Sequence, residues 1–87
     1  MEVCDGGTIN SGSTSVTFTN NKTQSCTITS CTLPGWPSTD PIVPAKQGTT
    51  PGSVIVQLSV AAQVGTYTYT PNCCAKRTNP TIKVESK

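Results

Sequence analysis

The part of the chain that decides the fold is residues 15–30, with the sequence SVTFTNNKTQSCTITS. Apolar side chains alternate there with threonine or serine on both sides of a polar turn, Asn-Asn-Lys, at residues 20–22. Such alternation is typical of a β-strand with one buried and one exposed face. The stretch therefore predicts strands at residues 15–19 and 26–30, the second extending towards Leu33.

The same alternation recurs further along the chain. It predicts strands at residues 53–60, 66–70 and 81–85, and more weakly one around residues 4–9 with a turn at residues 5–7. In the longest of these, one face carries Val54, Val56, Leu58 and Val60. Short strands separated by turn residues indicate an all-β sandwich or barrel.

Length and composition limit the classes of protein that fit. With 87 residues there is room for one domain, spanning residues 1–87. The chain is rich in threonine, and only 33% of its residues are hydrophobic and 11% charged. A net charge of +2 with 5% aromatic residues is too little for a nucleic-acid surface. No apolar run approaches the roughly 20 residues of a membrane span.

Residues 34–52 contain five prolines and are predicted to form a long loop. Loops of this length in small domains are usually functional or disordered. Trp36 lies in this loop and has two interpretations. It covers an open end of the core, or it is a contact residue for a protein or surface partner that binds through the loop.

Five cysteines in so short a chain indicate disulfides and an oxidising compartment, extracellular or periplasmic. An odd number leaves at least one thiol unpaired within the chain. If the thiols are instead reduced, the protein is cytoplasmic.

Two segments together resemble cupredoxins, the blue-copper β-sandwich proteins. Residues 16–21 (VTFTNN) and 26–29 (CTIT) are similar to the place where a cupredoxin strand ends in Asn and a His-Thr-Val-Thr segment follows. Residues 65–69 (GTYTY) and 81–84 (TIKV) are similar to the family's Gly-Thr-Tyr strand and final strand, and Pro51-Gly52 fits its Pro-Gly turn. The resemblance covers roughly residues 14–30 and 51–85, and it implies a Greek-key β-sandwich of about six to eight strands.

The resemblance also implies that the copper ligands are replaced. A type 1 centre needs two imidazoles, a thiolate and a weak axial methionine. The corresponding positions hold Cys26, Pro71, Cys74 and either Thr78 or Asn79. The chain has no histidine, and its one methionine is Met1. We therefore expect no type 1 copper, no other metal and no cofactor.

Former ligand positions of the resembled fold converge, so the resemblance places Cys26 beside Cys74 or its neighbour Cys73. A disulfide between them would stabilise the fold by roughly 4 kcal/mol on the chain-entropy model. Counting the remaining cysteines then pairs Cys4 with Cys31 and leaves one of the vicinal pair free.

The alternative is a thiol-based metal or redox protein that uses Cys26, Cys73 and Cys74 with Cu(I) or Zn. Cys31 does not fit such a site, because in an extended strand it lies about 17 Å from Cys26 at roughly 3.3 Å per residue. Lys76 and Arg77 would make the vicinal cysteines the one electropositive thiol environment of the sequence.

No pattern of catalytic residues is present in the sequence. Histidine, the commonest general base, is missing, and the four carboxylates share no motif. We therefore predict that the protein is not an enzyme. The preferred interpretation is a non-catalytic cupredoxin-like module without type 1 copper, with a structural or binding role in an exported protein.

Overall fold

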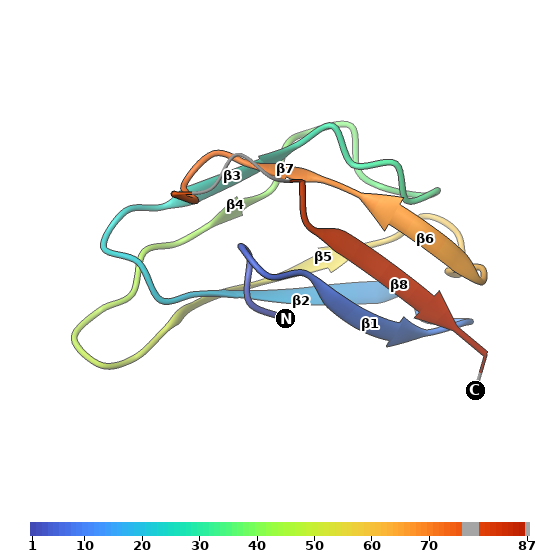
Figure 1. The fold of residues 1–87 in the computed structure, drawn as a ribbon, viewed down its shortest axis with the longest axis horizontal. Helices are drawn as coiled ribbons and strands as arrows, with labels where there is room; N and C mark the ends of the chain where they lie inside the picture. Colours follow the sequence, from blue (N-terminus) through green and yellow to red (C-terminus); the bar gives the residue numbers. More distant parts are fainter. Residues whose placement is uncertain (76–78, 87) are drawn as a thin grey trace.

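The computed structural model describes residues 1–75 and 79–86, which consist of short strands joined by turns and loops (Figure 1). The strands are β1 (Gly7–Asn10), β2 (Ser15–Asn20), β3 (Cys26–Thr29), β4 (Ile42–Val43), β5 (Gly52–Gln57), β6 (Gly65–Thr68), β7 (Thr70–Pro71) and β8 (Thr81–Glu85). These residues contain no helix, which confirms the all-β prediction. Accordingly, no helical segment in them has the length and apolar character to cross a membrane.

The strands of the described residues pair into three small sheets. β2 runs antiparallel to β5, with Phe18 opposite Val54. β3 lies between β4 and β7 and is antiparallel to both. β8 lies between β1, to which it is parallel, and β6, to which it is antiparallel. The predicted strands at residues 15–19, 26–30 and 81–85 are confirmed to within one residue at each end.

Alternation along the strands directs the apolar side chains into one hydrophobic core. In β2, Val16 and Phe18 are buried and Thr17 between them is exposed. β8 repeats this pattern, with Ile82 and Val84 inward and its charged residues outward. The core comprises Val3, Val16, Phe18, Cys26, Ile28, Leu33, Val43, Val56, Leu58, Ala62, Tyr69, Ile82 and Val84.

The segment at residues 34–52 is not only a loop, so that prediction is wrong at β4. The carbonyl of Pro41 accepts a 2.9 Å hydrogen bond from the Ile28 amide, and Val43 is buried opposite Cys26. Proline lacks an amide proton but keeps its carbonyl, so a strand flanked by prolines can still pair at the edge of a sheet.

Close approach of this segment to β5 depends on a glycine. A Cβ atom at Gly52 would overlap the carbonyl oxygen of Pro44. Any side chain at this position would therefore push β5 away from the end of β4.

Two predicted strands end earlier than expected. The strand predicted at residues 53–60 stops at Gln57, because Ser59 bonds to the Gly35 carbonyl and the chain turns away. As a result, Val60 does not share the inward face and is 50% exposed. The strand predicted at residues 66–70 is interrupted at Tyr69, which separates β6 from β7.

Two segments pass from one sheet to another, and they do so side by side. The N-terminal residues pair with Thr19 of β2, and the chain then joins β8 as β1. Likewise, β6 pairs with β8, whereas β7 pairs with β3. The hydroxyl of Tyr69, at the second crossing, donates a 2.7 Å hydrogen bond to the carbonyl of Val3, at the first. Cys4 follows the first crossing directly. Cys73 and Cys74 follow the second crossing, after β7.

Candidate functional site

The N-terminal turn places Cys4. The Val3 amide donates to the Thr19 carbonyl at 2.9 Å, and the amides of Asp5 and Gly6 both donate to the Glu2 carbonyl. Gly6 has a φ of 71°, and a Cβ atom there would overlap the Thr81 carbonyl oxygen. Only glycine suits both demands, so this turn packs closely on the start of β8 and fixes the backbone around Cys4.

β3 places Cys26, the second cysteine of the chain. Its side chain is completely buried and lies opposite Val43 of β4. Cys26 therefore belongs to the hydrophobic core.

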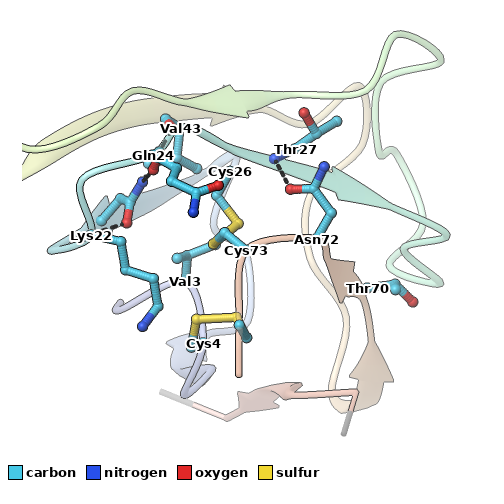
Figure 2. Close-up of a disulfide and its surroundings, with 12 residues drawn as sticks. Val3, Cys4, Lys22, Gln24, Cys26, Thr27, Val43, Thr70, Asn72 and Cys73 are labelled. Atoms are coloured by element: carbon cyan, nitrogen blue, oxygen red, sulfur yellow. Dashed lines mark hydrogen bonds between the residues drawn. A yellow bond between two sulfur atoms is a disulfide. The ribbon is translucent and has the colours of Figure 1, made fainter. Parts of the chain in front are cut away.

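The loop after β7 is attached to β3 by a reciprocal pair of hydrogen bonds. The Asn72 amide donates to the Thr27 carbonyl at 3.1 Å. In return, the Thr27 amide donates to Asn72 Oδ1 at 2.9 Å (Figure 2). This clamp fixes the residue immediately before Cys73, so the vicinal cysteines begin from a defined position.

The vicinal cysteines each bind a different partner. Cys73 forms a disulfide with Cys26, and Cys74 forms one with Cys4, with Cα–Cα distances of 5.1 Å and 5.7 Å (Figure 2). Both distances lie within the usual range for disulfides. The sulfur atoms of Cys4, Cys73 and Cys74 all lie within 4.8 Å of one another. One cluster thus links the N-terminal segment, β3 and the loop after β7.

The structure decides between the predicted cysteine pairings. The expected disulfide from Cys26 to the vicinal pair is present, and its partner is Cys73. The predicted pairing of Cys4 with Cys31 is wrong, because the N-terminal crossing brings Cys4 to Cys74 instead. The expectation of a free thiol at residue 73 or 74 fails for the same reason.

Cys31 is the one free cysteine. β3 ends at Thr29, and Ser30 adopts a left-handed conformation with a φ of 55°, which directs the chain away from the cluster. Burial raises the pKa of the Cys31 thiol, although a hydrogen bond with the Leu33 backbone opposes this effect. The thiol is therefore a weak nucleophile at neutral pH.

A buried polar residue near the cluster was not singled out by sequence reasoning. Asn20, at the end of β2, has no exposed surface. Its amide nitrogen donates to the carbonyls of Gln24 and Pro44 at 2.8 and 3.2 Å, and its Oδ1 accepts from the Lys22 amide at 2.9 Å. The only signal in the sequence was the Asn-Asn-Lys turn, which does not distinguish a buried asparagine from an exposed one.

Trp36 packs on the core, as the first of its two interpretations expects. Its half-buried ring meets Phe18 edge to face, with 6.0 Å between ring centroids. Its indole nitrogen is buried and has no hydrogen-bond partner among the described residues. Beside it, residues 37–41 and β5 enclose a shallow groove of about 240 Å³.

Two other residues at the resembled ligand positions, Pro71 and Asn79, lie in or beside β7. Pro71 pairs with Ile28, and Asn79 Oδ1 accepts a hydrogen bond from the Thr70 hydroxyl at 3.3 Å. Lys76, Arg77 and Thr78 lie outside the described residues.

No protein-family model, curated protein or solved structure matches this chain. Its class therefore follows from the fold and the cysteine geometry alone. It is a small all-β protein in which two adjacent disulfides cross-link three segments of the chain.

Proposed function

We propose that the chain is a non-catalytic structural or binding module of an exported protein, with a cupredoxin-like Greek-key β-sandwich fold that lacks type 1 copper. The double disulfide is the observation that carries this proposal. The absence of histidine from the sequence also supports it, since neither an imidazole ligand nor an imidazole base is available.

The free energy that the disulfides contribute is large relative to the total stability of so small a chain. They join residues 70 and 47 positions apart in the sequence. On the chain-entropy model, each loop of that length contributes roughly 4 kcal/mol, although the two contributions are not additive because the loops overlap. Domains of this size are stable by about 5–15 kcal/mol in total. Such dependence on disulfides favours an extracellular or periplasmic location, where they persist.

The sandwich assignment is supported by the way the strands share their core. Buried side chains of β2 and β5 pack in the same cluster as those of β3, β4 and β8. Strands that pass from one sheet to the other, as at Tyr69, are a common way to join two packed layers.

A partner would bind through the segment at residues 34–52. It carries Ile42, which is 57% exposed, and it borders the groove next to β5, where Ile55 is 60% exposed. Two large exposed apolar side chains suit a protein partner that presents an apolar segment.

Reduction of the disulfides tests the proposal. Urea denaturation of the oxidised protein is compared with that of the phosphine-reduced protein, with Cys31→Ser as the control for the free thiol. We expect reduction to lower the free energy of unfolding by at least about 3 kcal/mol in the parent and in Cys31→Ser alike. Before reduction, Cys31→Ser should be as stable as the parent, because Cys31 belongs to neither disulfide. If the reduced chain unfolds at the same urea concentration as the oxidised one, the structural role of the disulfides is refuted.

A further inference from the structure

We propose that the reduced protein binds one Cu(I) ion through the thiolates of Cys4, Cys73 and Cys74, so that the disulfides and the metal are alternative states of one sulfur cluster. This goes beyond the structural role proposed above, because it concerns the reduced chain.

The geometry of the three sulfur atoms suits one metal ion. They already lie within 4.8 Å of one another. Three thiolates around a single ion stand about 4 Å apart in a plane, if the metal–sulfur bond is roughly 2.3 Å as in zinc sites. Once both disulfides are reduced, the sulfur atoms of Cys4 and Cys74 need to move apart, whereas that of Cys73, released from Cys26, already lies within 4.8 Å of both.

Hydrogen bonds that do not involve sulfur hold the site in place after reduction. Beside Cys4, the backbone of Val3 is bound both by the Thr19 carbonyl and by the Tyr69 hydroxyl. Beside Cys73, Asn72 is bound twice to Thr27, through its backbone amide and its side-chain oxygen. The backbone positions of the ligands are thus defined by sheet pairing as well as by the disulfides, which preorganises the site.

The exposure of the cysteines determines the number of ligands. Cys4, Cys73 and Cys74 are partly exposed, so an ion can reach them from solvent, whereas Cys26 is completely buried in the core. Three sulfur ligands fall short of the four that structural zinc sites use, and soft thiolates suit Cu(I). This is why we expect Cu(I) rather than Zn(II).

The reaction balances with a trialkylphosphine as the reductant. Each phosphine takes an oxygen atom from water and becomes its oxide, and the two hydrogen atoms of that water complete the two thiols formed from one disulfide. Two phosphines therefore convert both disulfides to four thiols. Cu(I) then displaces the protons of Cys4, Cys73 and Cys74, which are released to solvent.

Titration with Cu(I) alone tests the proposal. The protein is reduced, freed of phosphine by gel filtration under anaerobic conditions, and titrated against a coloured Cu(I) chelator. We expect one ion per chain, at least tenfold weaker binding in Cys4→Ser and in Cys74→Ser, and unchanged binding in the matched control Cys31→Ser. Because every sample is reduced, no variant loses a cross-link that the others keep. The comparison therefore remains valid even for a partly unfolded apo chain.

Two results would overturn the proposal. One is equal Cu(I) binding by Cys4→Ser and Cys31→Ser, which would mean that any thiols of the chain suffice. The other is preferential binding of Zn(II) that is lost in Cys26→Ser, which would mean a four-sulfur site. Neither result affects the structural role, because that role is tested separately by the urea experiment, which compares the oxidised and reduced proteins without metal.

Discussion

The hydroxyl of Tyr69 donates a buried 2.7 Å hydrogen bond to the carbonyl of Val3, 66 residues earlier in the chain. Both residues have essentially no exposed surface, and each lies where the chain passes from one sheet to another. The tyrosine ring also meets Phe18 edge to face, with 5.3 Å between centroids. This contact joins the two crossings and thereby sets the positions of the cysteines that follow them.

Removing the hydroxyl should therefore destabilise the fold. We expect Tyr69→Phe to lower the free energy of unfolding by about 1–3 kcal/mol, because the Val3 carbonyl is left buried without its donor. The matched control is Tyr67→Phe, whose hydroxyl bonds to the Gln63 carbonyl in a solvent-exposed position. Urea denaturation of both variants measures the difference. Equal losses of stability in the two variants would show that the bond to Val3 contributes no more than the exposed one.

Tyr69 should also make stability sensitive to alkaline pH. Burial raises the pKa of its hydroxyl far above the ordinary value of about 10, the Gly6 backbone opposes this, and the charges of Glu2 and Asp5 add to the increase. The folded state thus holds the proton more tightly than the unfolded state. The stability that comes from this protonated hydroxyl is fully present below pH of about 10. It is lost progressively as the pH rises above that value, by up to about 1.4 kcal/mol per pH unit.

The measurement is the free energy of unfolding between pH 8 and pH 12, in a Cys31→Ser background that prevents disulfide exchange. Tyr69→Phe should show a flatter decline above pH of about 10 than the parent. Identical slopes in the two proteins would count against a buried, protonated Tyr69.

Asn20 should be much more sensitive to substitution than its neighbour. Asn20→Ala removes the partners of the Gln24 and Pro44 carbonyls and of the Lys22 amide. We expect a loss of about 2–4 kcal/mol, because several backbone groups are left without a hydrogen bond. Asn21→Ala is the control, since that exposed side chain makes one 3.2 Å bond to Glu2, and its loss should be below about 0.5 kcal/mol. Similar melting of the two variants would contradict the role given to Asn20.

Trp36 offers a direct test of its position on the core. Trp36→Ala should lower stability by about 2–3 kcal/mol, less than for a fully buried tryptophan, because the ring is only half-buried. Trp36→Phe keeps an aromatic ring against Phe18 and removes an indole nitrogen that has no partner in the described structure. It should therefore change stability by less than about 1 kcal/mol. Unaltered thermal melting of Trp36→Ala would mean that the ring serves only as a contact residue.

The strands could be predicted from the sequence wherever one face is buried. Alternation in β2 and β8 reports directly on the pleat, because Val16 and Phe18, or Ile82 and Val84, must point the same way. β4 escaped prediction because two residues between prolines are too short for any period to show. Its pairing is decided by the neighbouring strand.

The cysteine cluster could be predicted only in part. The meeting of Cys26 with the vicinal pair was implied by the cupredoxin resemblance, and Cys73 is its partner. The pairing of Cys4 with Cys74 could not be predicted, because it depends on two sheet crossings that leave no periodic signal. Cysteine counting gives the number of pairings that are possible, and geometry alone selects one.

The disulfide map tests the central claim most directly. The denatured, unreduced protein is first alkylated to label free thiols, then partly reduced at acidic pH and alkylated with a second reagent, then fully reduced and alkylated with a third. Mass-spectrometric fragmentation then locates each label on the chain. The structure predicts the first label on Cys31 alone, one shared label on Cys4 and Cys74, and another shared label on Cys26 and Cys73. A label shared by Cys4 and Cys31, or by Cys26 and Cys74, would contradict it.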